Sequence, residues 1–148
     1  MPQRDYSEVA RAFVKEARVD LRSARLLSDG GEHSRAVAAC QQAVEKAVKA
    51  ALALKGVIVL EHQVADRLAV AFPKMKNVRQ IARKVKALEW EGTKTRYPLF
   101  GRVDLPIWMP SDSYNEDDAN EAIADTEWVI REIMIFIEQE YHLKLQEE

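Results

Sequence analysis

The chain has 148 residues, one cysteine and a formal net charge of −2. This size fits one domain that needs no disulfide, because folding buries about 70% of the unfolded surface of such a chain. No apolar run approaches the roughly 20 residues that span a bilayer, and the N-terminus lacks a signal-peptide core, so we expect no membrane segment and a cytoplasmic protein. Cys40 stands among Ala39, Ala43 and Val44 and is expected to fill a buried position.

The first predicted helix covers residues 6–29. Apolar side chains recur there at steps of three and four residues, and the pattern stops at Gly30-Gly31. Asp20 falls in the middle of this apolar stripe. A buried carboxylate needs a cation or several donors, so we predict that Asp20 pairs with Arg96. Such a pair either pins the later loop to the bundle or holds a functional arginine in place.

The second predicted helix ends at Gly56, which is suited to a left-handed cap. On a helical wheel, one half is apolar and its edge is rich in alanine, which permits close packing by a neighbouring helix. Opposite lies a contiguous polar arc, which consists of Gln41, Gln42, Glu45, Lys46 and Lys49. A helix that needs only solubility tolerates any mixture of charges there, so the arc indicates either a solvated face or a binding site.

Three more helices are predicted. A short one covers residues 63–71, and a basic one covers residues 77–90 with Gly92 as its stop. About twenty residues with three prolines follow, a length that favours a functional or clamped segment. Ser113 and Glu116 form a capping-box pattern at the start of the last helix. The buried stripe of that helix is expected to contain Ala119, Ala122, Ile123, Ile130, Ile133 and Ile137.

No alternating strand pattern, internal repeat or linker stands out. The sequence therefore predicts an all-α, up-and-down bundle of four to five helices, with a single domain over residues 1–148. Its charges are uneven, with eight basic and two acidic residues in 74–96, and twelve acidic and two basic residues in 112–148. Such asymmetry indicates either a basic surface for phosphates or two segments that neutralise each other within a dimer.

The sequence has few candidate catalytic groups. It lacks a glycine-rich phosphate loop, an H-E-x-x-H motif and paired cysteines, and His33, His62 and His142 lie far apart. We therefore expect no metal site and no cofactor. His62, just before the short helix, is the histidine that we consider for a supporting functional role.

Several segments together resemble a known family. These are "ARVDLRSARLLSDGGEHSRAVAACQQAVEKAVKAALALKG", "EHQVADRL", "TRYP", and Tyr114 before an alanine-spaced final helix. They resemble the HEPN domain family (higher eukaryotes and prokaryotes nucleotide-binding domain) over about residues 7–138. The resemblance implies a bundle of four or five helices that is commonly dimeric and is often encoded beside a minimal nucleotidyltransferase. It also implies a role in toxin–antitoxin pairs, RNA cleavage or nucleotide binding.

The sequence departs from the ribonucleases of this family at their R-x4-6-H motif. No histidine here has an arginine five to seven positions upstream. The tyrosine that some members place after that histidine, as an acceptor of adenylyl groups, therefore has no motif here. We predict that the chain binds but does not cleave.

The candidate site combines the polar arc with the segment after the basic helix. Amides read polar edges, cations meet phosphate and an aromatic ring stacks on a base. The predicted nucleotide-binding residues are Gln41, Gln42, Glu45, Lys46, Arg96 and Tyr97, with Asp20 and His62 in support. Three hypotheses remain: a nucleotide- or RNA-binding partner of a minimal nucleotidyltransferase, a ribonuclease with a divergent site around His62, and a purely structural dimerisation module. A homodimer is expected, because exposed helix faces in a small bundle of this family resemblance are usually completed by a second copy.

Overall fold

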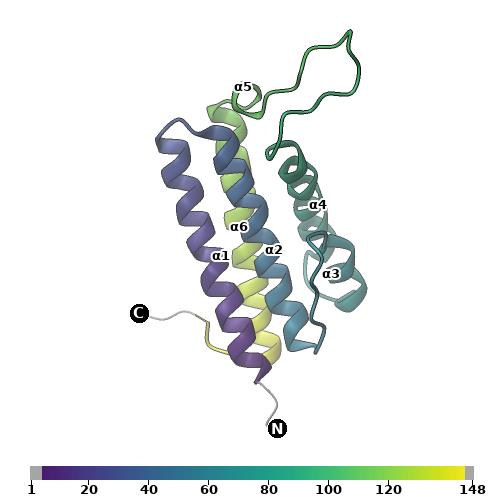
Figure 1. Cartoon of the computed structure of the whole chain (residues 1–148). Coiled ribbons are helices and arrows are strands. Elements are labelled where there is room, and N and C mark those ends of the chain that lie inside the picture. The colour runs from purple at the N-terminus through teal and green to yellow at the C-terminus, as the bar shows by residue number, and fades with distance from the viewer. Residues whose placement is uncertain (1–4, 146–148) are drawn as a thin grey trace.

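The computed structural model describes residues 5–145. These residues form six helices and no strand (Figure 1). The helices are α1 (Tyr6–Asp29), α2 (His33–Leu54), α3 (Ala65–Ala71), α4 (Val78–Lys94), α5 (Pro110–Ser113) and α6 (Glu116–Tyr141). The all-α prediction is confirmed. The number of helices exceeds the predicted four to five because four residues before the last helix form α5.

The long helices pack around α2. Helix α2 lies between α1 and α6 on one side and α3 and α4 on the other, and α1 also packs on α6 (Figure 1). Alanines line the contact of α1 with α2, among them Ala10, Ala17 and Ala24 of α1, which are fully buried. Small side chains let the backbones of α1 and α2 approach closely. Because α3, α4 and α6 also pack on α2, this helix is buried on most sides. Cys40 is fully buried, as predicted, and burial raises the pKa of its thiol to about 11.

The first two predicted helices match the structure well. Helix α1 covers the predicted 6–29, and Asp5 caps it by accepting a hydrogen bond from the backbone N–H of Ser7 at 2.8 Å. Helix α2 ends just before Gly56, whose φ of +79° is the expected left-handed conformation. Helix α3 begins two residues later than predicted, at Ala65.

Two predicted helix boundaries are wrong. Gly92 does not stop α4, which continues to Lys94 with Gly92 buried inside it. Ser113 does not cap α6 either, because its hydroxyl donates to the carbonyl of Met109 at 2.7 Å within α5. The capping box is formed two residues later by Asn115 and Asp118.

The segment 96–109 leaves the bundle at the end of α4 and returns to it at α5 (Figure 1). We call it the arm. Its two limbs are joined by backbone hydrogen bonds between Leu99 and Trp108 in both directions, at 3.0 and 2.8 Å. Most of its large apolar side chains are exposed, including Phe100 and Val103.

Candidate polar cleft between α2, α3 and α4

The polar arc of α2 is partly buried. Gln41 is 3% exposed and Glu45 is 8% exposed, because this part of the arc faces α4 and the segment before α3. Buried polar side chains need partners, since an amide or a carboxylate without them costs several kcal/mol. Gln41, Glu45 and Lys49 of the arc therefore form a connected polar cluster, whereas Gln42 of the same arc is exposed.

Gly92 explains how α4 comes so close to this cluster. A Cβ atom at this position would lie 2.6 Å from Cγ of Gln41 and 3.0 Å from both Cδ and Oε1. Only glycine allows the α4 backbone to pass over the Gln41 side chain at this distance. The sequence predicted that Gly92 stops the helix. Instead, Gly92 lies within α4 and allows the close approach that fixes the Gln41 side chain.

Glu45 is the hub of the cluster. Its Oε1 accepts a hydrogen bond from Nε2 of Gln41 at 2.9 Å, and its Oε2 accepts one from Nζ of Lys49 at 2.9 Å. Nδ1 of His62 lies 3.1 Å from the same Oε2. Burial alone would raise the pKa of Glu45, but the hydrogen bonds from Lys49, His62 and Gln41 outweigh it and lower that pKa. Glu45 is therefore a charged carboxylate that holds the side chains of Gln41, Lys49 and His62 in place.

His62 and Arg96 extend the cluster to the surface. The His62 side chain is 70% exposed, so its ring reaches solvent while Nδ1 contacts Glu45. Arg96 donates from one guanidinium NH2 to Oε1 of Gln41 at 3.3 Å. Thr95, which is buried, precedes it and donates its hydroxyl to the carbonyl of Gly92 at 2.9 Å. The buried Gln41 and Glu45 thereby connect an exposed arginine with an exposed histidine.

Glu89 of α4 holds the other wall in place. Its Oε1 accepts the backbone N–H groups of Val64 and Ala65, both at 2.9 Å, where α3 begins. Burial raises the pKa of Glu89, the two backbone bonds offset this in part, and the negative charges of Asp66 and Glu45 raise it further. Glu89 therefore ties the segment that carries His62 to α4.

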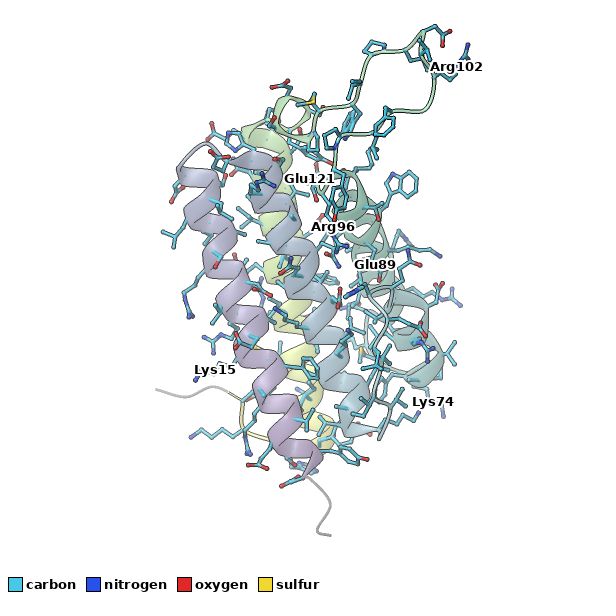
Figure 2. All side chains as sticks on the ribbon, in the orientation of Figure 1. Lys15, Lys74, Glu89, Arg96, Arg102 and Glu121 are labelled. Atoms are coloured by element: carbon cyan, nitrogen blue, oxygen red, sulfur yellow. The ribbon has the colours of Figure 1, made fainter. Side chains whose placement is uncertain are left out.

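A cleft of about 360 Å³ lies between these groups. It is lined by Gln41, Glu61, His62, Gln63, Glu89, Thr93 and Arg96. Figure 2 shows Glu89 and Arg96 at α4, on the side that faces α2. Glu61 is already paired with Arg67 at 2.8 Å, whereas Arg96 is in no ion pair within residues 5–145. The cleft therefore offers one cation that is in no ion pair, one accessible imidazole and several amide and hydroxyl groups, beside the carboxylates of Glu61 and Glu89.

The structure brings four of the predicted site residues together and leaves four outside. Gln41, Glu45, His62 and Arg96 form the connected cluster. The others are placed elsewhere: Gln42 is exposed, Tyr97 is 69% exposed and does not line the cleft, and Lys46 and Asp20 are bonded to each other.

The predicted ion pair of Asp20 with Arg96 is wrong. Oδ2 of Asp20 accepts from Nζ of Lys46 at 2.6 Å, and the Asp20 side chain is 17% exposed. The physical reason is the close packing of α1 on α2, which places the lysine of the neighbouring helix next to the carboxylate. Arg96 follows α4, which packs on the opposite side of α2 (Figure 1). The need for a cationic partner was correctly predicted, but its identity was not.

Sequence reasoning missed the contributions of Glu89, Gly92 and Lys49. Glu89 could have been noticed as an acidic residue within a strongly basic helix. Gly92 is an isolated glycine in a helical pattern, which often marks a close approach of two backbones. Lys49 belongs to the predicted polar arc but was left out of the predicted site.

A second pocket, of about 380 Å³, lies between α4, α5 and α6. Trp90, Trp108 and Tyr114 line it, and Nζ of Lys94 lies 5.2 and 6.0 Å from the ring centroids of Trp108 and Trp90. The hydroxyl of Tyr114 donates to Glu91, and burial together with this bond raises the pKa of Tyr114. Because the chain's own Lys94 and Glu91 already contact these three aromatic side chains, we regard this pocket as structural.

The fold and the cleft together define an all-helical bundle with one polar cleft beside its central helix. Residues 10–136 match the model of the HEPN domain. The chain belongs to the HEPN domain family. It is 33% identical over 144 residues to the protein "Putative toxin MJ1304" of Methanocaldococcus jannaschii, over 91% of this chain and 92% of that protein.

Two solved structures share the fold. One is TT1696 from Thermus thermophilus, with a TM-score of 0.71 and 26% identity over 84% of this chain and 94% of that one. The other is ST0689, an archaeal HEPN homologue, with a TM-score of 0.66 and 26% identity over 91% of this chain and 98% of that one. Among residues 5–145, none of the helices is both long and apolar enough to cross a membrane.

Proposed function

We propose that the protein is a nucleotide- or RNA-binding HEPN module, and that it acts in a toxin–antitoxin-like pair with a minimal nucleotidyltransferase. The observation that carries the binding proposal is the connected cluster of Arg96, Gln41, Glu45 and His62 at the 360 Å³ cleft. The similarity to a protein named as a toxin supports the pair, and the family resemblance supports the nucleotidyltransferase. We also propose that the protein acts in the cytoplasm.

Each group of the cleft has a chemical role in this proposal. Arg96 meets a phosphate group, because a guanidinium donates in a planar fork that matches phosphate oxygens. Gln41 holds Arg96 and is itself held by Glu45, so less side-chain entropy is lost on binding. The His62 ring and the Gln63 amide face a base or ribose from the other wall. Tyr97, next to Arg96 and exposed, offers a stacking surface at the rim.

Replacing Arg96 with glutamine is expected to weaken nucleotide binding by about 10- to 100-fold, which corresponds to one lost charge-assisted hydrogen bond. Isothermal titration with a panel of adenosine and guanosine mono- and triphosphates measures this. Arg83→Gln is the matched control, because Arg83 is exposed like Arg96 but lies within α4 and does not line the cleft. Equal affinities of Arg96→Gln and wild type would remove Arg96 from the site. If wild type binds no nucleotide or RNA but still dimerises, the structural alternative is favoured.

A ribonuclease remains the second candidate because of one observation. His62 and Arg96 line the same cleft although they are far apart in the sequence, and Glu45 contacts Nδ1 of His62. A carboxylate in this position orients a histidine that acts as a general base. We still expect a mixed single-stranded RNA pool to stay intact, because the chain lacks the R-x4-6-H motif. Cleavage that disappears in His62→Ala would favour the ribonuclease instead.

We also propose that the protein is a homodimer and that the arm takes part in the interface. Phe100 is 82% exposed and Val103 is fully exposed, together with other apolar side chains of the arm. Contiguous exposed apolar surface marks interaction sites, and two-fold dimers are the commonest assemblies. Sedimentation equilibrium should give about twice the chain mass of 16.9 kDa at micromolar concentration. Phe100→Ser/Val103→Ser should give the monomer mass.

The matched control for the arm is Leu60→Ser/Val70→Ser. These two side chains are exposed to a similar degree, 88% and 81%, but lie outside the arm. If both double variants stay dimeric, the arm is not the interface. If wild type is a monomer, the homodimer proposal fails.

A further inference from the structure

A row of cations runs along one side of α1. Arg11, Lys15, Arg18, Arg22 and Arg25 are all exposed and follow one another at steps of four, three, four and three residues. At 100° per residue this spacing places all five within an arc of about 80°, and at 1.5 Å per residue the row is about 21 Å long. We call it the α1 cation row. Figure 2 shows Lys15 at the outer side of α1.

The α1 cation row borders a groove between α1 and α6. Two hollows of about 450 and 350 Å³ lie along the row and share Arg18 and Arg22 in their walls. The larger lies between α1 and α6, and the smaller is lined by α1 and Leu145. Helix α6 adds the exposed Arg131 to the larger hollow. The two acidic residues that line the groove are Glu127, which is paired with Arg25 at 2.8 Å, and Glu138, which accepts the backbone N–H of Leu145. Six cations therefore face two carboxylates, in a chain whose net charge is −2.

The charges of the row are mostly uncompensated. Within residues 5–145, Arg25 is in an ion pair, whereas Lys15, Arg18 and Arg22 are in none. Arg11 donates to the backbone carbonyl of Lys144 at 3.3 Å. The acids in the middle of α1 do not balance the row: Asp20 is paired with Lys46 of α2, and Glu16 is on another side of the helix wheel. Like charges repel in a row of this kind, so it favours an anionic ligand.

The composition of the row points to phosphate groups along a chain. Four of its five members are arginines, which donate to phosphate oxygens in a bidentate manner. A linear track of cations fits the regularly spaced charges of a nucleic acid backbone. Of the apolar residues along the groove, Leu21, Ile130 and Met134 are buried in the core, whereas Ile135 is 42% exposed. An acidic protein partner would need a larger exposed apolar centre in the interface than this one side chain.

We propose that the α1 cation row and Arg131 bind the sugar–phosphate backbone of a single RNA strand. This surface is separate from the polar cleft, because α1 packs on α2 and α6, while the cleft is formed by α2, α4 and the segment before α3 (Figure 1). The row contacts phosphates and reads no bases, so it contributes affinity without sequence preference.

The test compares two variants with the same loss of charge. Arg18→Gln/Arg22→Gln changes the centre of the row, and Arg79→Gln/Arg83→Gln changes two arginines of α4 that are also exposed. Fluorescence anisotropy measures binding of a labelled single-stranded RNA of roughly 12 nucleotides, which is within the usual site sizes of single-strand binders. The affinity is measured over a series of salt concentrations.

The row variant is expected to bind this RNA at least tenfold more weakly near 0.1 M salt. Each lost phosphate contact lowers the magnitude of the negative slope of log K against log salt by about 0.7, so two lost contacts lower it by about 1.4. The α4 variant should retain the wild-type affinity and slope. If both variants lose RNA affinity equally, the loss reflects net charge alone and the proposal fails. If wild type binds no RNA, the proposal also fails.

Two further measurements separate the alternatives. A polyglutamate peptide of the same length serves as the probe for an acidic protein. If this peptide binds as tightly as RNA, and Arg18→Gln/Arg22→Gln abolishes that binding, the row is a protein-binding surface and the RNA assignment is wrong. Mononucleotide titration of the row variant should match wild type, because the cleft is unchanged. The row and the cleft can thus fail independently.

Discussion

Replacing Glu45 with alanine is expected to lower the free energy of unfolding by about 3 kcal/mol, because it leaves the nearly buried ammonium of Lys49 without its counter-charge. The side chains of Glu45 and Lys49 are 10% and 11% exposed. The variant also removes the acceptor for Gln41 and the contact to His62, so nucleotide binding at the cleft should fall with stability. Chemical denaturation measures the first effect and titration measures the second.

A surface ion pair provides the control for Glu45. Glu127 is paired with Arg25 at 2.8 Å, but both side chains are about half exposed. Exposed pairs contribute about 0.2–1 kcal/mol, so Glu127→Ala should change stability by less than about 1 kcal/mol. If Glu45→Ala lowers the free energy of unfolding no more than this control does, then solvent screens the ion pair of Glu45 with Lys49. In that case Glu45 does not stabilise the fold as proposed.

The pH dependence of stability tests the charge of Glu45 directly. The folded protein lowers the pKa of this carboxyl from its usual 4.5, so the unfolded chain takes up the proton first as the pH falls. The stabilisation by the charged form is therefore complete above pH 4.5 and is lost as the pH falls through the lowered pKa of the folded state. The difference in stability between wild type and Glu45→Gln should be constant near neutral pH and shrink below pH 4.5. A difference that grows in acid would contradict the lowered pKa.

Replacing Gly92 with leucine is expected to destabilise the fold by about 3 kcal/mol and to abolish binding at the cleft. Its Cβ alone would lie 2.6 Å from Cγ of the buried Gln41, so α4 must move away from α2 or Gln41 must leave its place. Either movement breaks the hydrogen bond from Arg96 to Gln41. Thermal denaturation and nucleotide titration measure the two effects.

Gly92→Ala tests the same contact, because it can either raise or lower the stability of the fold. Alanine favours a helix interior over glycine by about 1 kcal/mol, so a slack contact would make this variant more stable. We expect a net loss of stability instead, and recovery of most of it in Gly92→Ala/Gln41→Ala, where the contacted atoms are gone. Gly101→Leu is the control, because nothing lies within 4 Å of a Cβ there. A stabilising Gly92→Ala would show that the close approach does not hold Gln41.

The dimer proposal bears on how the cleft operates. The arm begins at Arg96 itself, which is a cleft residue, and continues through Tyr97 to the exposed apolar tip. A second chain that covers the arm would restrict the motion of Arg96. In that case Phe100→Ser/Val103→Ser should weaken nucleotide binding as well as dimerisation, although neither residue lines the cleft.

The sequence by itself indicated the five longer helices, though not α5, because the evidence for a helix is local. Steps of three and four residues between apolar side chains, together with Gly30 and Gly56, predicted α1 and the end of α2, and the structure confirms both. The same local pattern sorted the residues of α2 into an apolar half and a polar arc. The segments that resemble HEPN domains added the family, and the match over residues 10–136 confirms it.

Only the tertiary structure decided which polar groups meet, because contacts between distant segments depend on how the helices pack. A wheel shows that Gln41 and Lys46 share the polar arc of α2, but not that α4 covers the first and α1 supplies a carboxylate to the second. Gly92 looked like a stop because the same residue type serves both for helix ends and for close approach. Asp20 carries a local sign that it needs a cation, and the packing of α1 on α2 selected Lys46 rather than Arg96.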